Sequence, residues 1–140
     1  ELNWTAPIIT PWVSYTPSTN GFGTLTNVNV KSRRVNSDLE LKFYFLTGSP
    51  SASEARVFMG YNGVDNSVTS ASAEPNISVV GQCLTTNAGS TPIYVLSELS
   101  KNYLVFGTTT NGLTTKLTGS GMTAASKEIS CTAKVQIDGW

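Results

Sequence analysis

The sequence predicts an all-β fold, an antiparallel β-sandwich or jelly-roll-like domain of about eight to ten short strands. Apolar and polar residues alternate along most of the chain, and apolar residues at the helical period of 3.6 are almost absent. Asn-Gly and Ala-Gly pairs separate these segments, at Asn20-Gly21, Asn62-Gly63, Ala88-Gly89 and Asn111-Gly112. Short strands with such turns between them are typical of sandwiches and jelly rolls. The absence of an internal repeat argues against a β-helix or propeller.

Three segments carry the clearest strand pattern. Residues 128–137 place five apolar side chains on one face and five polar side chains on the other. Residues 38–45 and 25–34 alternate in the same way, and Val35–Asp38 between them predicts the turn of a hairpin. Weaker strands are predicted at 55–59, 77–84, 93–96, 103–106 and 113–117, with a short helical turn at 97–101. Residues 60–76 and 118–127 are predicted to be long loops, which are uncommon without a role.

The chain of 140 residues has a length typical of one domain. Because it starts at Glu1 without methionine, we expect residues 1–11 to be a linker from an upstream region and residues 12–140 to form a single domain. No apolar run approaches the roughly 20 residues of a membrane span, so membrane insertion is not expected. No leader peptide is visible either.

Composition excludes several classes of function. Charged residues make up 13% of the chain, nine basic and nine acidic, about half of the roughly 25% usual in soluble domains. This balance argues against nucleic-acid binding, which needs clustered lysine and arginine. Histidine is absent, which removes Ser-His and Cys-His nucleophile pairs and His-ligated zinc. Thr (19), Ser (17) and Asn (11) supply a third of the chain instead.

The remaining chemical groups predict neither catalysis nor a cofactor. Cys83 and Cys131 lie at apolar strand positions and are expected to be buried thiols, with a disulfide as the alternative. They are too few for a structural metal site, and residues 60–66 lack the spacing of a calcium loop. Glycoside hydrolysis needs two carboxylates. The acids are scattered instead and are predicted to be solvated or ion-paired: Glu40, Glu54, Asp65, Glu74, Glu98 and Asp138.

Arg33 and Arg34 are predicted to straddle a strand, one of them pairing with Glu40 or Glu54, with an anion clamp as the alternative. Aromatic rings with polar neighbours are the usual means of binding sugars, through ring contact and hydrogen bonds. On this ground we predict a glycan-binding patch in the long loop, formed by Tyr61, Asn62, Asp65 and Asn66. Trp12, Tyr15 and Trp140 are predicted to serve the core or a subunit interface instead.

Several short motifs, in their order along the chain, resemble a module found in structural proteins of tailed bacteriophages. They are Trp12-Val-Ser-Tyr15-Thr-Pro17, Gly21-Phe-Gly-Thr24, Asn27, Arg33-Arg34-Val35, Asp38-Leu-Glu-Leu41, Thr47-Gly48, Glu54-Ala-Arg56 and Val135-Gln-Ile137-Asp-Gly-Trp140. The module is similar to the C-terminal β-sandwich of tail fibres and tailspikes. The likeness covers roughly residues 12–59 and 128–140, and residues 60–127 depart from it.

This resemblance implies a virion tail protein, made in the bacterial cytoplasm and acting outside the cell. It implies a homotrimer that attaches the phage to host polysaccharide or lipopolysaccharide and carries no catalytic residues, since glycan cleavage belongs to upstream domains in that family. Three alternatives stay open: a structural trimerisation clamp or virion decoration module without ligand, a small glycan hydrolase or lyase, and a monomeric carbohydrate-binding module of a secreted enzyme.

Overall fold

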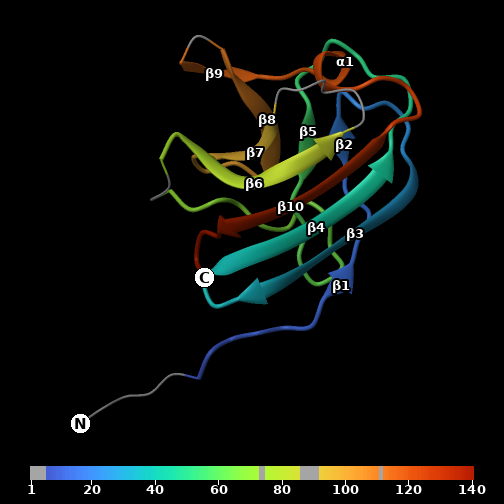
Figure 1. Ribbon diagram of the computed structural model, residues 1–140. Helices are drawn as coiled ribbons and strands as arrows, with labels where there is room; N and C mark the ends of the chain where they lie inside the picture. Colours follow the sequence, from blue (N-terminus) through green and yellow to red (C-terminus); the bar gives the residue numbers. More distant parts are fainter. Residues whose placement is uncertain (1–5, 73–74, 86–91, 111) are drawn as a thin grey trace.

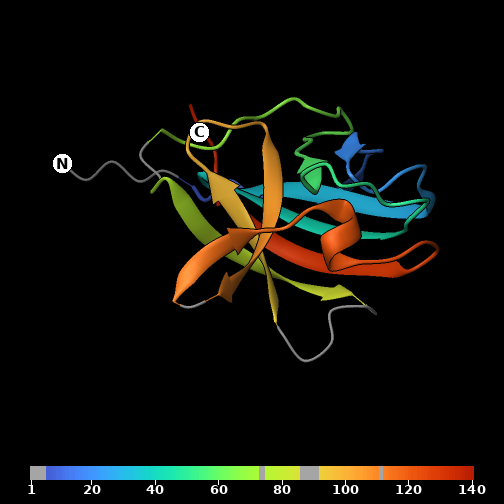
Figure 2. The same ribbon diagram turned by 90° about the horizontal axis from the view of Figure 1, so that it is seen from above.

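A single antiparallel sheet makes up the computed structural model (Figure 1), which describes residues 6–72, 75–85, 92–110 and 112–140. Within these residues its ten strands are β1 (Val13–Ser14), β2 (Thr19–Asn20), β3 (Thr26–Val35), β4 (Asp38–Leu46), β5 (Arg56–Phe58), β6 (Ile77–Thr85), β7 (Ile93–Glu98), β8 (Tyr103–Thr110), β9 (Leu113–Lys116) and β10 (Glu128–Gln136). Their order is β1-β3-β4-β10-β6-β7-β8-β5-β2, with β9 paired to β8. The sheet curls into a half-barrel, seen from above in Figure 2. The prediction of an all-β antiparallel fold is confirmed.

The strongest sequence patterns form three neighbouring strands inside this sheet, β3, β4 and β10. β10 lies between β4 and β6 and pairs with β4 along its whole length, from Glu128 opposite Leu46 to Gln136 opposite Asp38. The predicted hairpin turn joins β3 to β4, with Val35 opposite Asp38. Of the predicted turns, Ala88-Gly89 and the Asn111 of Asn111-Gly112 lie outside the described residues.

Two local predictions differ from the structure. The helical turn at 97–101 is wrong, because β7 continues through Ser97, which is buried and pairs with Leu104 of β8. A short helix, α1 (Gly119–Met122), lies instead in the segment expected to be a loop. Residues 8–10, expected to be linker, hydrogen-bond to the end of β3, with Ile9 bridging Val35. No helix among the described residues is long and apolar enough to cross a membrane.

The core lies on the inner side of the curl. The alternation in β4 and β10 turns their apolar side chains inward, and the phenylalanines meet there from both halves of the sheet. The ring centroids of Phe43 from β4 and Phe106 from β8 are 6.2 Å apart, and Phe22 packs edge-on against Phe106 at 5.8 Å. These contacts join strands that are distant in the order of the sheet, so one core serves the whole domain.

Residues 13–20 connect the two edges of the curled sheet. β1 pairs with β3 at one edge, and β2 pairs with β5 at the other. Between them, the Tyr15 amide donates to the carbonyl of Val30, and the Tyr15 hydroxyl donates to the carbonyl of Phe58 at 2.9 Å. A Cβ on Gly60 would lie 2.6 Å from the Tyr15 ring, so only glycine allows this approach. This seam, defined by Tyr15, Phe58 and Gly60, holds the half-barrel together.

Candidate functional site

The outer face of β3, β4, β10 and β6, here called the open face, carries a grid of polar side chains. Because the strands are in register, outward side chains form rows across the sheet. One row consists of Asn29, Tyr44, Ser130 and Leu84, and the next consists of Lys31, Lys42, Thr132 and Gln82. A third contains Arg33, Glu40 and Lys134. The open face therefore combines hydroxyls, amides, lysines and an aromatic ring.

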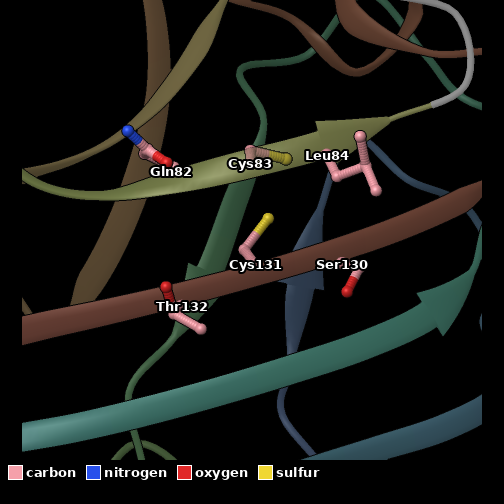
Figure 3. A pocket seen from close by; sticks show the side chains of 6 residues that line it. All are labelled: Gln82, Cys83, Leu84, Ser130, Cys131 and Thr132. Carbon is pink, nitrogen blue, oxygen red and sulfur yellow. The ribbon is translucent and has the colours of Figure 1, made fainter.

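Three shallow hollows lie next to one another on the open face. The first, of about 310 Å³, lies between β6 and β10, where Gln82 and Leu84 face Ser130 and Thr132 (Figure 3). The second, of about 290 Å³, is lined by outward residues of the first two rows: Asn29, Lys31, Lys42, Tyr44, Ser130 and Thr132. The third, of about 280 Å³, lies beside Trp12. Their shared walls give a continuous track across the strands.

Trp12 borders this track and holds basic side chains in place. Its ring lies 4.7 Å from the Arg33 guanidinium carbon and 4.9 Å from the Lys42 ammonium. Cations over an indole face are attracted by its quadrupole. Trp12 is half-buried, so part of its surface stays available at the edge of the track.

The charges on the open face are unevenly paired. Arg33 bonds Glu40 at 3.1 Å, which confirms the predicted pairing of one arginine with Glu40. Lys134 lies 3.7 Å from Asp38. Lys31 and Lys42, in contrast, stand directly opposite each other and have no acidic partner among the described residues. Two like charges opposite each other in a sheet are unfavourable, so the middle row carries an uncompensated positive charge.

The predicted glycan patch lies at the seam, and most of its members bond to other parts of the chain. Asp65 accepts hydrogen bonds from the Ser18 amide at 2.9 Å and from the Ser18 hydroxyl at 2.7 Å. The Asn66 side chain accepts one from Asn102. Tyr61 packs edge-on against Trp140 at 4.8 Å. Asn62 is exposed, in a turn with positive φ. These contacts hold residues 61–66 against Ser18, Asn102 and Trp140.

The three predicted structural aromatics have different surroundings. Tyr15 is buried in the core, 6% exposed. Trp140 is half-buried between Tyr61 and the Arg34 guanidinium, which lies 4.6 Å from its ring. Trp12 is the member of this group that borders the open face.

Cys83 and Cys131 are free thiols opposite each other on β6 and β10. Figure 3 shows the Cys131 side chain projecting from β10 toward β6, where Cys83 lies. Burial raises the pKa of Cys131 well above its ordinary value, and the neighbouring Cys83 raises it further. Cys131 is thus a buried thiol, as expected, whereas Cys83 is only half-buried. No group of three or more Cys, Asp or Glu side chains in the described part of the chain could hold a metal ion.

The other half of the sheet carries an ion-paired face, defined by Glu54, Arg56, Glu98 and Lys116. The Lys116 ammonium lies 3.2 Å from Glu54 and 3.1 Å from Glu98, and Arg56 bonds Glu54 at 2.8 Å. Burial alone would raise the pKa of Glu54, but the bonds from Arg56 and Lys116 outweigh it and lower the pKa. Two carboxylates thus meet here, both neutralised by cations.

Lys31 and Lys42 were not among the site residues predicted from the sequence. A signal was present, because the predicted hairpin turn sets the register of its strands. Counting back four residues from Val35 and forward four from Asp38 gives this pair. No local sequence pattern indicates that Glu54 and Glu98 share a partner. Both bond to Lys116, which lies on a strand farther along the chain.

Comparison with protein-family models gives no match, and neither does comparison with curated proteins or with solved structures.

Proposed function

We propose that the chain is the C-terminal, sandwich-like domain of a bacteriophage tail fibre or tailspike, which forms homotrimers and attaches the virion to glycans on the host surface. The observation that carries the attachment role is the open face. Its track combines Tyr44 and Trp12 with hydroxyl and amide groups, the chemistry that meets the apolar faces and hydroxyls of sugars. The meeting of Phe43 and Phe106 from opposite halves of the sheet supports a sandwich-like arrangement.

A row of exposed apolar side chains on β6 supports the trimer. Ile77, Val79 and Leu84 of β6, here called the β6 stripe, have exposed side chains. Val79 is 66% exposed and Leu84 is 72% exposed. Exposed apolar groups on a sheet are a common feature of protein interfaces. Burial of the β6 stripe between copies would cover the first hollow, which Leu84 lines, and would leave the second hollow on β3, β4 and β10 accessible.

Binding fits the geometry better than hydrolysis does. The two carboxylates that meet, Glu54 and Glu98, are both bonded to Lys116. A general acid needs a raised pKa, whereas the pKa of Glu54 is lowered by Arg56 and Lys116. We therefore favour glycan attachment over glycoside hydrolysis as the function of the chain.

Sedimentation of the purified chain tests the trimer with a matched pair of variants. Leu84→Lys should convert trimers to monomers, because it places a charge in each copy's interface. Leu113→Lys should remain trimeric, since Leu113 on β9 is equally exposed, at 72%, but lies away from the β6 stripe. A monomeric wild-type chain would contradict the trimer and favour the carbohydrate-binding module.

Retention of host-surface polysaccharides on a glycan array tests attachment. We expect wild-type protein to be retained on at least one glycan, and weak single-site binding to be strengthened by the presence of three sites. A trimer that is retained on no glycan would favour the structural clamp instead.

A further inference from the structure

We propose that the paired lysines of the open face bind an anionic sugar residue, one that carries a carboxylate or a phosphate. This inference rests on the proposed function and specifies the glycan. The site is the second hollow, where Lys31 from β3 and Lys42 from β4 face the same space of about 290 Å³. An anion placed between the two ammonium groups would receive charge-assisted hydrogen bonds from both.

The register of the strands argues for a ligand of opposite charge. Lys31 and Lys42 are opposite each other at the middle of the β3–β4 pair, where a like-charge pair lowers stability. In the neighbouring row the charge of Arg33 is neutralised within the chain, because Arg33 forms an ion pair with Glu40 on the opposite strand. No acidic side chain among the described residues does this for the lysines. An external anion would supply the missing charge.

The groups around the lysines suit a sugar better than an isolated ion. Tyr44, one row away, offers an aromatic ring, and Trp12 holds the Lys42 ammonium from the other side, 4.9 Å from its ring. Ser130 and Thr132 place hydroxyls on the adjoining strand. A pyranose with an anionic substituent would thus find ring contacts, hydrogen-bond partners and charge within one hollow.

A nucleic acid fits this site less well. Binding along a phosphate backbone needs a series of basic contacts. The third row has only cations that are already paired, Arg33 with Glu40 and Lys134 with Asp38. Two unpaired lysines in a hollow favour one or two anionic groups on a glycan.

Binding of matched glycan pairs tests the proposal. The probes are tetragalacturonate with its carboxyl-reduced neutral form, and a phosphorylated mannose oligosaccharide with its dephosphorylated form. Wild-type protein should bind at least one anionic probe at least about tenfold more tightly than its neutral counterpart, as the charge-assisted bonds predict. The preferred pair identifies carboxylate or phosphate as the recognised group. Raising the salt concentration should weaken this binding.

Two double variants with equal changes of charge localise the effect. Lys31→Gln with Lys42→Gln should weaken binding of the anionic probe about tenfold or more. The control, Lys101→Gln with Lys127→Gln, removes two exposed lysines away from the three hollows, one on the β7–β8 turn and one just before β10. It should bind as the wild type does. Thermal melts should show all three proteins folded, because Lys31 and Lys42 make no ion pair with the described residues.

Several outcomes of these experiments would overturn the inference. Equal binding of anionic and neutral probes, equal binding by the two double variants, or equally tight binding of a single-stranded DNA oligonucleotide would do so. Retention of neutral glycans alone would overturn it while leaving the proposed function in place. A wild-type protein that binds no glycan would overturn both.

Discussion

The two outer faces of the curled sheet arise from the same strand alternation, but their charged side chains are paired on one face and partly unpaired on the other. On the ion-paired face, four charged side chains neutralise one another, with Lys116 bonding both Glu54 and Glu98. On the open face, Lys31 and Lys42 stand opposite each other with no acidic partner in the described chain. Charges that are satisfied within the fold contribute to stability, whereas charges left unsatisfied are available to a ligand. One face thus neutralises its charges within the fold, and the other is the face that we propose to bind glycans.

The largest expected effect concerns the core that both faces share. Burial raises the pKa of Tyr15 far above its ordinary value of 10.0. The neutral phenol is thus favoured by folding, and this contribution is fully present below pH 10 and is lost as the pH rises further. We expect urea unfolding experiments to show stability falling steeply above pH 10.

Tyr15→Phe provides the control for this effect, because it removes the titrating group and the bond to Phe58. At pH 7 it should cost about 1–2 kcal/mol, because the Phe58 carbonyl loses its partner. Its stability should fall less than that of the wild type between pH 10 and 12. Parallel curves for the two proteins would contradict the assignment.

Removal of the central cation of the ion-paired face should have the next largest effect. Lys116→Gln leaves Glu54 and Glu98 close together with one bridging charge fewer. The side chains are 15–36% exposed, so solvent limits the loss of unfolding free energy to about 1–2 kcal/mol. Chemical denaturation at pH 7 measures it, and an unchanged midpoint would show that the network contributes nothing.

The ion-paired face should also set the acid stability. Burial opposes ionisation of Glu54, but Arg56 and Lys116 lower its pKa below the ordinary value of 4.5. A lowered pKa in the folded state gives stability that is present above pH 4.5 and is lost as the pH falls through the folded value. Glu54→Gln should therefore flatten the stability curve below pH 4.5 in urea titrations. A curve as steep as that of the wild type would contradict this role of Glu54.

The smallest effect is expected on the open face. Lys31→Gln relieves repulsion with Lys42 and removes no ion pair to the described residues. The unfolding free energy should stay unchanged or rise by a few tenths of a kcal/mol. A loss as large as that of Lys116→Gln, measured in the same denaturant series, would remove the distinction between the two faces.

Much of the sheet could be predicted from the sequence, because its central strands alternate without interruption. In β4 and β10 every second residue is apolar, so these patterns alone identify which side chains face the core. β1 and β2 have two residues each, and their pairing depends on partners brought together by the fold, so no local pattern marks them.

The candidate site was less accessible to prediction for a related reason. The loop 60–76 suggested a ligand patch by its length and composition. Its polar groups, however, bond to residues far away in the chain, as Asp65 does with Ser18 across 47 positions. The open face depends on short-range register for Lys31 and Lys42, but on the long-range pairing of β10 with β4 for Ser130 and Thr132. Only the first of these can be derived from the sequence.

Mapping of amide chemical shifts by nuclear magnetic resonance, during titration with the anionic oligosaccharide that binds best, tests the central claim most directly. Perturbed amides should cluster on β3, β4 and β10 around Lys31, Lys42 and Thr132, with little change at Glu54, Glu98 and Lys116. The amides around Tyr61, where the glycan patch was first predicted, serve as a second comparison within the same spectra. Perturbations centred on the ion-paired face or on Tyr61, with the lysine row unaffected, would contradict the account.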